Sequence, residues 1–231
     1  MTELPKLDSR GKHFRVAAAF PSGERAMNEP NAPQAVAAIS IAGYDYGRPS
    51  AAHSPVSLEE LRALEASAGW SEADAECLSR HGNIFRDHAE EMVDTWRAVI
   101  GSRPALVKWF FGPDGKPDDN YKAAVKKRFV QWVLDACFRP HDQVWLDYQE
   151  EIGLRHTPLK KNLTDGAHAP PVVPMRYLIS FVTVVTTSTR KFFVDSGLSG
   201  EELQKLEDAW AKTVQLHISL WCRPYVGEGL W

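Results

Sequence analysis

The sequence predicts an all-α protein, and three observations support this prediction. Ser57 and Ser199 each stand three residues before a glutamate, Glu60 and Glu202, which is the capping-box signature of a helix start. Apolar residues recur at intervals of three and four along the longer segments, which is the spacing of a helix face. The sequence has no convincing hairpin signal and no internal repeat.

Length and composition predict one folded domain behind a short extension. The 231 residues are 44% hydrophobic and 25% charged with a formal net charge of −3, so neither nucleic acid nor a membrane surface is an expected partner. Residues 1–40 are rich in Ala and Pro without a sustained period, and we expect a poorly ordered extension, with Met27 as an alternative start. Residues 41–231 are predicted to form the domain.

The cysteines and the apolar segments predict a cytoplasmic protein. Cys77, Cys137 and Cys222 are widely spaced and odd in number, which favours reduced thiols over a disulfide framework or a zinc site. The N-terminus lacks the pattern of a secretory signal. The most apolar run, YLISFVTVVTT, falls well short of the roughly 20 residues that span a bilayer.

The predicted domain reads as a series of helices. An irregular segment, 41–56, leads to helices that open at Ser57 and Ser71. Gly101 ends a longer helix, and Pro104 suits the first turn of the short one that follows. The later helices are predicted over 118–139, around His156, over 175–193 and over 199–222. The linker 157–174 is the longest predicted loop, and such loops often lie beside functional sites.

One histidine is expected on an inward helix face. Trp145, Tyr148, Ile152 and His156 are spaced three, four and four residues apart, so they share one side of a helix, and no second ligand stands beside the histidine. His156 is then either a core histidine satisfied by a backbone carbonyl or a single axial ligand to haem iron. The spacing alone leaves both interpretations open.

A wider pattern adds a family resemblance. The segments that carry the resemblance are, in this order, DTWRAVIG, YKAAVKKRFVQWVLDACFRPHDQVWLDYQEEIGLRH, KKN, RYLISF and WCRPYV. From about Ile41 to the C-terminus the chain closely resembles the protoglobin family. Protoglobins are single-domain haem globins related to the sensor domains of globin-coupled sensors. The resemblance implies a globin fold with an extra N-terminal helix and a pre-helical segment, haem b as the cofactor, and a homodimer formed through the last two long helices.

The resemblance also implies roles for individual residues. His156 matches the proximal histidine, and positions on the distal side or near the haem are matched by Trp96, Val125, Arg128, Phe129, Leu178, Phe181 and Val185. Arg128 is expected to pair with a haem propionate, with a solvated surface charge as the alternative. For the aromatic rings the alternative is ordinary core packing.

One position departs from the family. Protoglobins carry a tyrosine next to the distal tryptophan, whereas this chain has Arg97. Arg97 either reaches over the iron to stabilise an anionic ligand, or turns out to solvent, a propionate or a nearby carboxylate. Desolvation of a buried guanidinium favours the second arrangement.

The expected function is reversible binding of O2, CO or NO at a five-coordinate haem iron, for gas binding, scavenging or sensing. The alternatives are a haem enzyme acting on peroxide, nitric oxide or nitrite with help from Arg97, and a haem-free helical interaction module. No output segment follows the globin-like region, so a sensor would act through a separate signalling partner, and an enzyme would need a separate reductase.

Overall fold

Helices make up nearly all the regular structure of the described chain. The computed structural model describes residues 41–227 and 229–231, so the predicted extension at 1–40 lies outside the described residues. Within them there are eight α-helices and two 3₁₀ helices: α1 (Leu58–Ala68), α2 (Glu72–Arg80), α3 (Gly82–Ser102), α4 (Pro104–Val107), η1 (Lys108–Phe110), α5 (Asp119–Phe138), α6 (Gln143–Leu154), α7 (Met175–Asp195), α8 (Gly200–Cys222) and η2 (Arg223–Tyr225). The all-α prediction is confirmed.

Local sequence explains where several helices begin. At α1 the Ser57 hydroxyl accepts a hydrogen bond from the Glu60 N–H at 3.1 Å, and the Glu60 carboxylate accepts one from the Ser57 N–H at 2.8 Å. Asp142 caps α6 by accepting from the Trp145 N–H at 2.9 Å. The capping box expected at Ser199 is not formed, because the Glu202 carboxylate turns instead to His81, 3.1 Å away.

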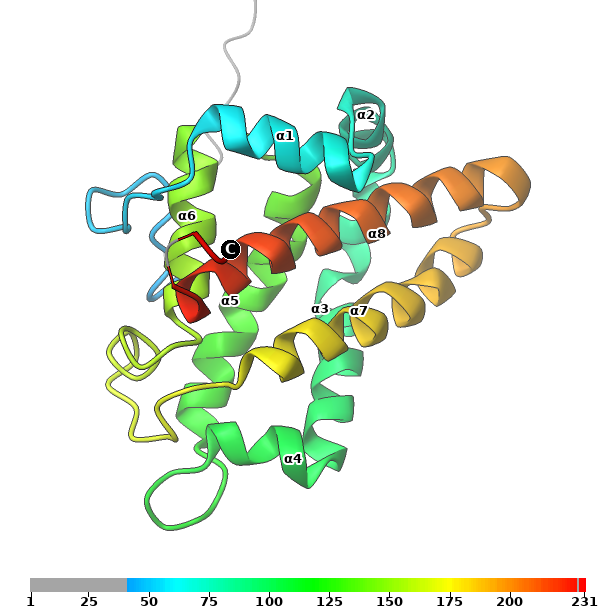
Figure 1. Ribbon diagram of the computed structural model, residues 1–231. Coiled ribbons are helices and arrows are strands. Elements are labelled where there is room, and N and C mark those ends of the chain that lie inside the picture. Colours follow the sequence, from blue (N-terminus) through cyan, green and yellow to red (C-terminus); the bar gives the residue numbers. More distant parts are fainter. Residues whose placement is uncertain (1–40, 228) are drawn as a thin grey trace, which may run out of the picture. The chain divides into compact units, whose positions relative to one another are not determined.

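The long helices pack across one another (Figure 1), and large aromatic side chains are buried between them. Helix α8 packs against α2, α6 and α7, and α3 packs against α5 and α7. The largest fully buried side chains are Trp96, Trp145, Trp210, Phe85 and Phe193. Burying each such ring contributes about 1.5–3 kcal/mol, so this core holds the helices in fixed positions around the site. Within the described residues, no helix has both the length and the apolar character that crossing a bilayer requires.

The pre-helical segment 41–56 is folded against α5 and α6. The Tyr44 hydroxyl donates to Asp135 of α5 at 2.7 Å, and the Tyr44 ring meets the Tyr148 ring of α6 edge-on, with centroids 5.2 Å apart. The Ser54 N–H donates to Asp147 of α6 at 2.9 Å. These contacts hold the segment against both helices.

Candidate functional site

A largely apolar cavity of about 500 Å³ lies between α3, α5, α6, α7 and α8, and η1 and the loop 157–174 also border it. Its apolar wall includes Ile152, Phe129, Trp132, Leu178, Phe181 and Trp221. This volume is typical of small-molecule and cofactor sites, which are mostly apolar with a few placed polar groups. The structure therefore offers a site for a sizeable apolar ligand.

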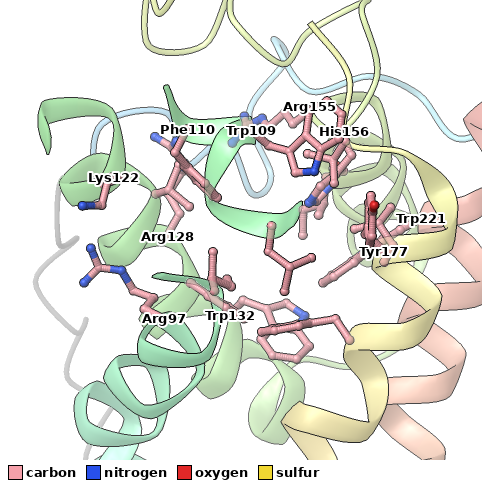
Figure 2. A pocket seen from close by; sticks show the side chains of 18 of the residues that line it. Arg97, Trp109, Phe110, Lys122, Arg128, Trp132, Arg155, His156, Tyr177 and Trp221 are labelled. Atoms are coloured by element: carbon pink, nitrogen blue, oxygen red, sulfur yellow. The ribbon is translucent and has the colours of Figure 1, made fainter. Parts of the chain in front are cut away.

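His156 borders this cavity from just beyond the end of α6 (Figure 2). The helix predicted to contain it ends two residues earlier, at Leu154. The Thr157 hydroxyl donates to the Leu154 carbonyl at 2.8 Å, and Pro158 follows, which disfavours helical geometry at the residue before it. His156 thus sits in a turn, with its own carbonyl accepting from the Tyr225 hydroxyl at 3.0 Å.

The ring nitrogens of His156 have distinct roles. Nδ1 lies 2.8 Å from the Ile152 carbonyl oxygen, which can only accept a hydrogen bond, so Nδ1 carries the proton. In a neutral imidazole, Nε2 then holds a free lone pair. The ring is also stacked on Trp221, with centroids 5.9 Å apart and planes 18° apart. The hydrogen bond to a backbone carbonyl, expected for a core histidine, is present. It uses only one ring nitrogen, so the other is left for a ligand, as the haem interpretation requires.

The surroundings of His156 keep it neutral. Burial is the main effect, and together with the charges of Lys161 and Arg155 it lowers the pKa of His156 to about 4, despite the opposing hydrogen bond to Ile152. A metal-ligating histidine must be deprotonated at the ligating nitrogen. At neutral pH, His156 already meets this condition.

The structure brings most of the predicted site residues to the cavity. Those that line it, besides His156, are Arg97, Val125, Arg128, Phe129, Leu178, Phe181 and Val185. Trp96 lies behind the wall, where its indole N–H donates to Ser188 at 2.8 Å and its ring centroid is 5.1 Å from that of Phe129. Trp132 lines the cavity instead. Its position three residues after Phe129 on the same helix is the sequence signal that would have identified it.

Arg97 takes the second of the two arrangements considered for it. Its guanidinium lies 3.2 Å from the Asp94 carboxylate, one turn earlier on α3, and its side chain is 29% exposed. In Figure 2 it lies at the edge of the cavity opposite His156 and points away from the cavity. The Arg97 charge is therefore paired at the edge of the cavity and does not lie over its apolar interior.

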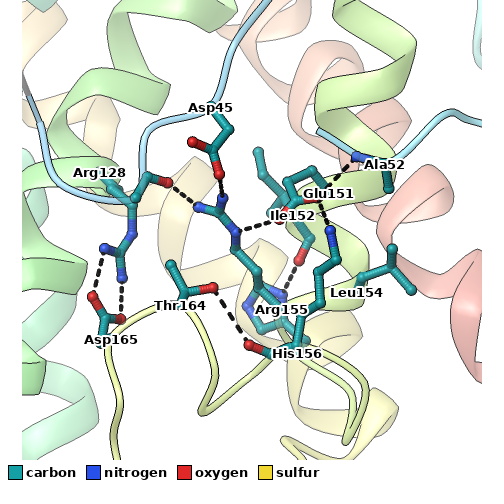
Figure 3. A network of polar contacts seen from close by, with 12 residues as sticks. Asp45, Ala52, Arg128, Glu151, Ile152, Leu154, Arg155, His156, Thr164 and Asp165 are labelled. Carbon is teal, nitrogen blue, oxygen red and sulfur yellow. Dashed lines mark hydrogen bonds and ion pairs between the residues drawn. The ribbon is translucent and has the colours of Figure 1, made fainter. Parts of the chain in front are cut away.

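Arg128 is already paired with a carboxylate of the chain. It makes two hydrogen bonds to Asp165, at 2.9 and 2.6 Å (Figure 3). A third hydrogen bond runs to the Ala42 carbonyl at 3.0 Å. This fork joins α5 to the loop 157–174 and to the pre-helical segment. Pairing with an external carboxylate would require Arg128 to share or exchange Asp165.

A second charged network holds the turn that carries His156 (Figure 3). Arg155 contacts Asp45 at 2.8 Å and Glu151 at 3.0 Å, and it also donates to the Gly43 carbonyl. Burial alone would raise the pKa of Glu151, but hydrogen bonds from Lys160 and the Ala52 N–H, with the charge of Arg155, lower it. The residue before His156 is thereby tied to the pre-helical segment.

The comparisons with known proteins agree with this geometry. The protoglobin family model matches residues 57–231. The chain belongs to the protoglobin family. This protoglobin is therefore a haem globin, as that family is. The globin domain of a Geobacter sulfurreducens globin-coupled sensor has a similar fold, with a TM-score of 0.57 and 15% identity, covering 72% of this chain and 97% of that one. No curated protein matches the chain.

The residues of the cavity fit a haem group. A neutral imidazole with one free nitrogen borders an otherwise mostly apolar space, which is what a single axial ligand and a porphyrin require. Among the described residues no cluster of three or more His, Cys, Asp or Glu side chains could hold a metal ion by itself. A metal in this cavity would therefore depend on a cofactor for its remaining ligands.

Proposed function

We propose that this protoglobin binds haem b with His156 Nε2 as the axial ligand of the iron, and that it reversibly binds O2, CO or NO on the opposite side. The observation that supports this most strongly is the neutral His156, whose Nδ1 is bonded to Ile152 and whose ring borders the apolar cavity. Haem, when bound, supplies an iron with one coordination position open to a gas.

The side chains around the cavity suit gas binding rather than a second protein ligand. Phe129, Phe181 and Val185 have no atom that ligates iron, and Trp132 already donates its indole N–H to His217 at 2.8 Å. Their apolar surfaces offer water no hydrogen-bond partners, which favours an apolar ligand there. The Ile152 carbonyl fixes the His156 tautomer, and the Trp221 ring holds the imidazole plane.

The enzymatic alternative lacks its expected polar group. Turnover of peroxide or nitrite assisted by Arg97 requires the guanidinium inside the cavity, whereas it pairs with Asp94. Reversible gas binding, for storage, scavenging or sensing through a separate partner, needs no such group. Cys77, Cys137 and Cys222 are free thiols, which supports the cytoplasmic location expected from the sequence.

Haem content of two matched variants tests the proposal. We expect the purified protein to carry one haem per chain, His156→Gly to lose most of it, and added imidazole to restore it by occupying the vacated space. His168→Gly, which removes an exposed histidine from the neighbouring loop, should leave haem content unchanged. Full retention of haem and of the ferrous spectrum by His156→Gly would contradict the proposal.

A further inference from the structure

Five Lys and Arg side chains line the cavity, and they differ in whether a carboxylate of the chain neutralises their charge. Four of them have a carboxylate partner. The pairs are Arg97 with Asp94 at 3.2 Å, Lys122 with Asp119 at 3.0 Å, Arg128 with Asp165 at 2.6 Å, and Arg155 with Asp45 at 2.8 Å. Lys161 is the fifth, and it has no carboxylate partner among residues 41–227 and 229–231. The exception is also a buried residue, only 3% exposed.

The contacts of Lys161 leave most of its hydrogen-bonding capacity unused. Its ammonium donates to the Trp109 carbonyl at 2.8 Å and lies 5.2 Å from the centre of the Tyr121 ring. An ammonium has three N–H donors, so two remain without a partner in the described part of the chain. Burial alone lowers the pKa of Lys161 to about 8. Buried charges in proteins are normally paired, because removing one from water without a counter-charge is costly.

We infer that Lys161 binds a carboxylate of the molecule that fills the cavity. Resting on the proposed function, this carboxylate is a propionate of the porphyrin. An anion beside Lys161 would receive charge-assisted hydrogen bonds from the two free donors. Arg128, the residue expected from the sequence to take this role, is already bonded to Asp165 and Ala42. Lys161 is thus the cavity cation whose charge remains to be neutralised.

A purely structural role is the competing explanation. Lys161 belongs to the loop 157–174, and Trp109 belongs to η1, so their hydrogen bond ties these two segments together. If this tie were the only role, removing it would destabilise the empty protein and would not affect the choice between ligands that differ only in their carboxylates. The two explanations therefore predict different results.

The test compares two porphyrins that differ in their carboxylates. The full-length protein, freed of haem, is titrated with metal-free protoporphyrin IX and with its dimethyl ester, and binding is followed by porphyrin fluorescence. Because neither ligand contains iron, His156 is not required. The variants are Lys161→Met, Lys161→Gln, which keeps a donor for the Trp109 carbonyl but has no charge, and the control Lys122→Met, at a cavity lysine that has its own carboxylate.

We expect the preference for the diacid over the diester to fall by about 10- to 100-fold in both Lys161 variants, the range of one charge-assisted hydrogen bond. Lys122→Met should keep the parental preference. We also expect the Tm of the porphyrin-free protein to rise in Lys161→Met, because the variant removes an unpaired buried charge.

Two results would overturn the inference, and they are distinguishable. An unchanged preference with tight binding, above all with a lowered Tm in Lys161→Met, would assign Lys161 to loop support and leave the porphyrin site intact. Failure of both porphyrins to bind the parent protein would remove the proposed function itself, and this inference with it.

Discussion

Replacing Arg97 by leucine should leave the ligand affinity of the haem-loaded protein nearly unchanged. In the structure the guanidinium is 29% exposed and pairs with Asp94, whose carboxylate also accepts from Lys126 at 2.8 Å. Exposed ion pairs contribute about 0.2–1 kcal/mol, and Asp94 keeps Lys126 when Arg97 is removed. We therefore expect the free energy of unfolding to fall by less than about 1 kcal/mol.

The effect on ligand binding separates the two arrangements of Arg97 sharply. A guanidinium that donated to a bound ligand would contribute about 1.5–3 kcal/mol, so its loss would weaken binding by more than tenfold. With Arg97 outside the cavity, we expect less than about a twofold change. The assay is cyanide titration of the ferric protein, followed by absorbance, for the parent and Arg97→Leu. Arg103→Leu, exposed at the end of the same helix, controls for the loss of one positive charge.

A tenfold or greater loss of cyanide affinity in Arg97→Leu alone would refute this reasoning. It would show that the guanidinium leaves Asp94 when a ligand binds, and it would favour the enzymatic alternative.

Three further predictions follow from contacts elsewhere in the chain. Gly153→Ala should lower the free energy of unfolding by about 1 kcal/mol, because the new Cβ would stand 3.1 Å from a carbonyl oxygen and a proline ring of the C-terminal segment. Gly101→Ala, which has open space around it, should raise the free energy of unfolding by a similar amount. Urea unfolding measures both. Burial holds the pKa of His217 well below its usual range, so the unfolded chain alone takes up this proton as pH falls below about 6.5, and stability should fall by about 1 kcal/mol per pH unit there. His217→Asn, which keeps an acceptor for the Trp132 indole, should reduce the measured slope by this amount, whereas His156, whose pKa is also lowered, keeps its own contribution. An unchanged slope would contradict the assignment. The affinity for the porphyrin diacid should fall by up to about tenfold per pH unit as pH rises above about 8, where the unliganded Lys161 loses its proton, and Lys161→Gln should lack this dependence.

The sequence predicted the helices well because their signals are local. Capping residues and apolar spacing placed the starts of α1 and α2 and the end of α3, and these depend on neighbours within one or two turns. The box at Ser199 was predicted wrongly, because Glu202 is drawn to a histidine 121 residues away. The end of α6 was placed two residues late, since the turn after Leu154 depends on Thr157 and on contacts with the C-terminal segment.

Parts of the site depend on long-range contacts that local patterns do not encode. The family motif identified His156 and most of the cavity wall, but it could not show that Arg128 pairs with Asp165 or that Lys161 is left without a carboxylate. Trp132 lines the cavity and Trp96 does not, and this depends on the packing of α3 against α5, which local spacing does not determine. The extra N-terminal helix and the homodimer through α7 and α8 stay predictions.

The most direct test of the central claim is the absorption spectrum of the purified protein in the ferric, dithionite-reduced and carbon monoxide forms, beside His156→Ala. We predict a five-coordinate ferrous haem that binds carbon monoxide, with the histidine-ligated spectrum lost in the variant. A protein that takes up no haem even after reconstitution, or a variant whose spectra match those of the parent, would contradict the account and return His156 to a role in packing.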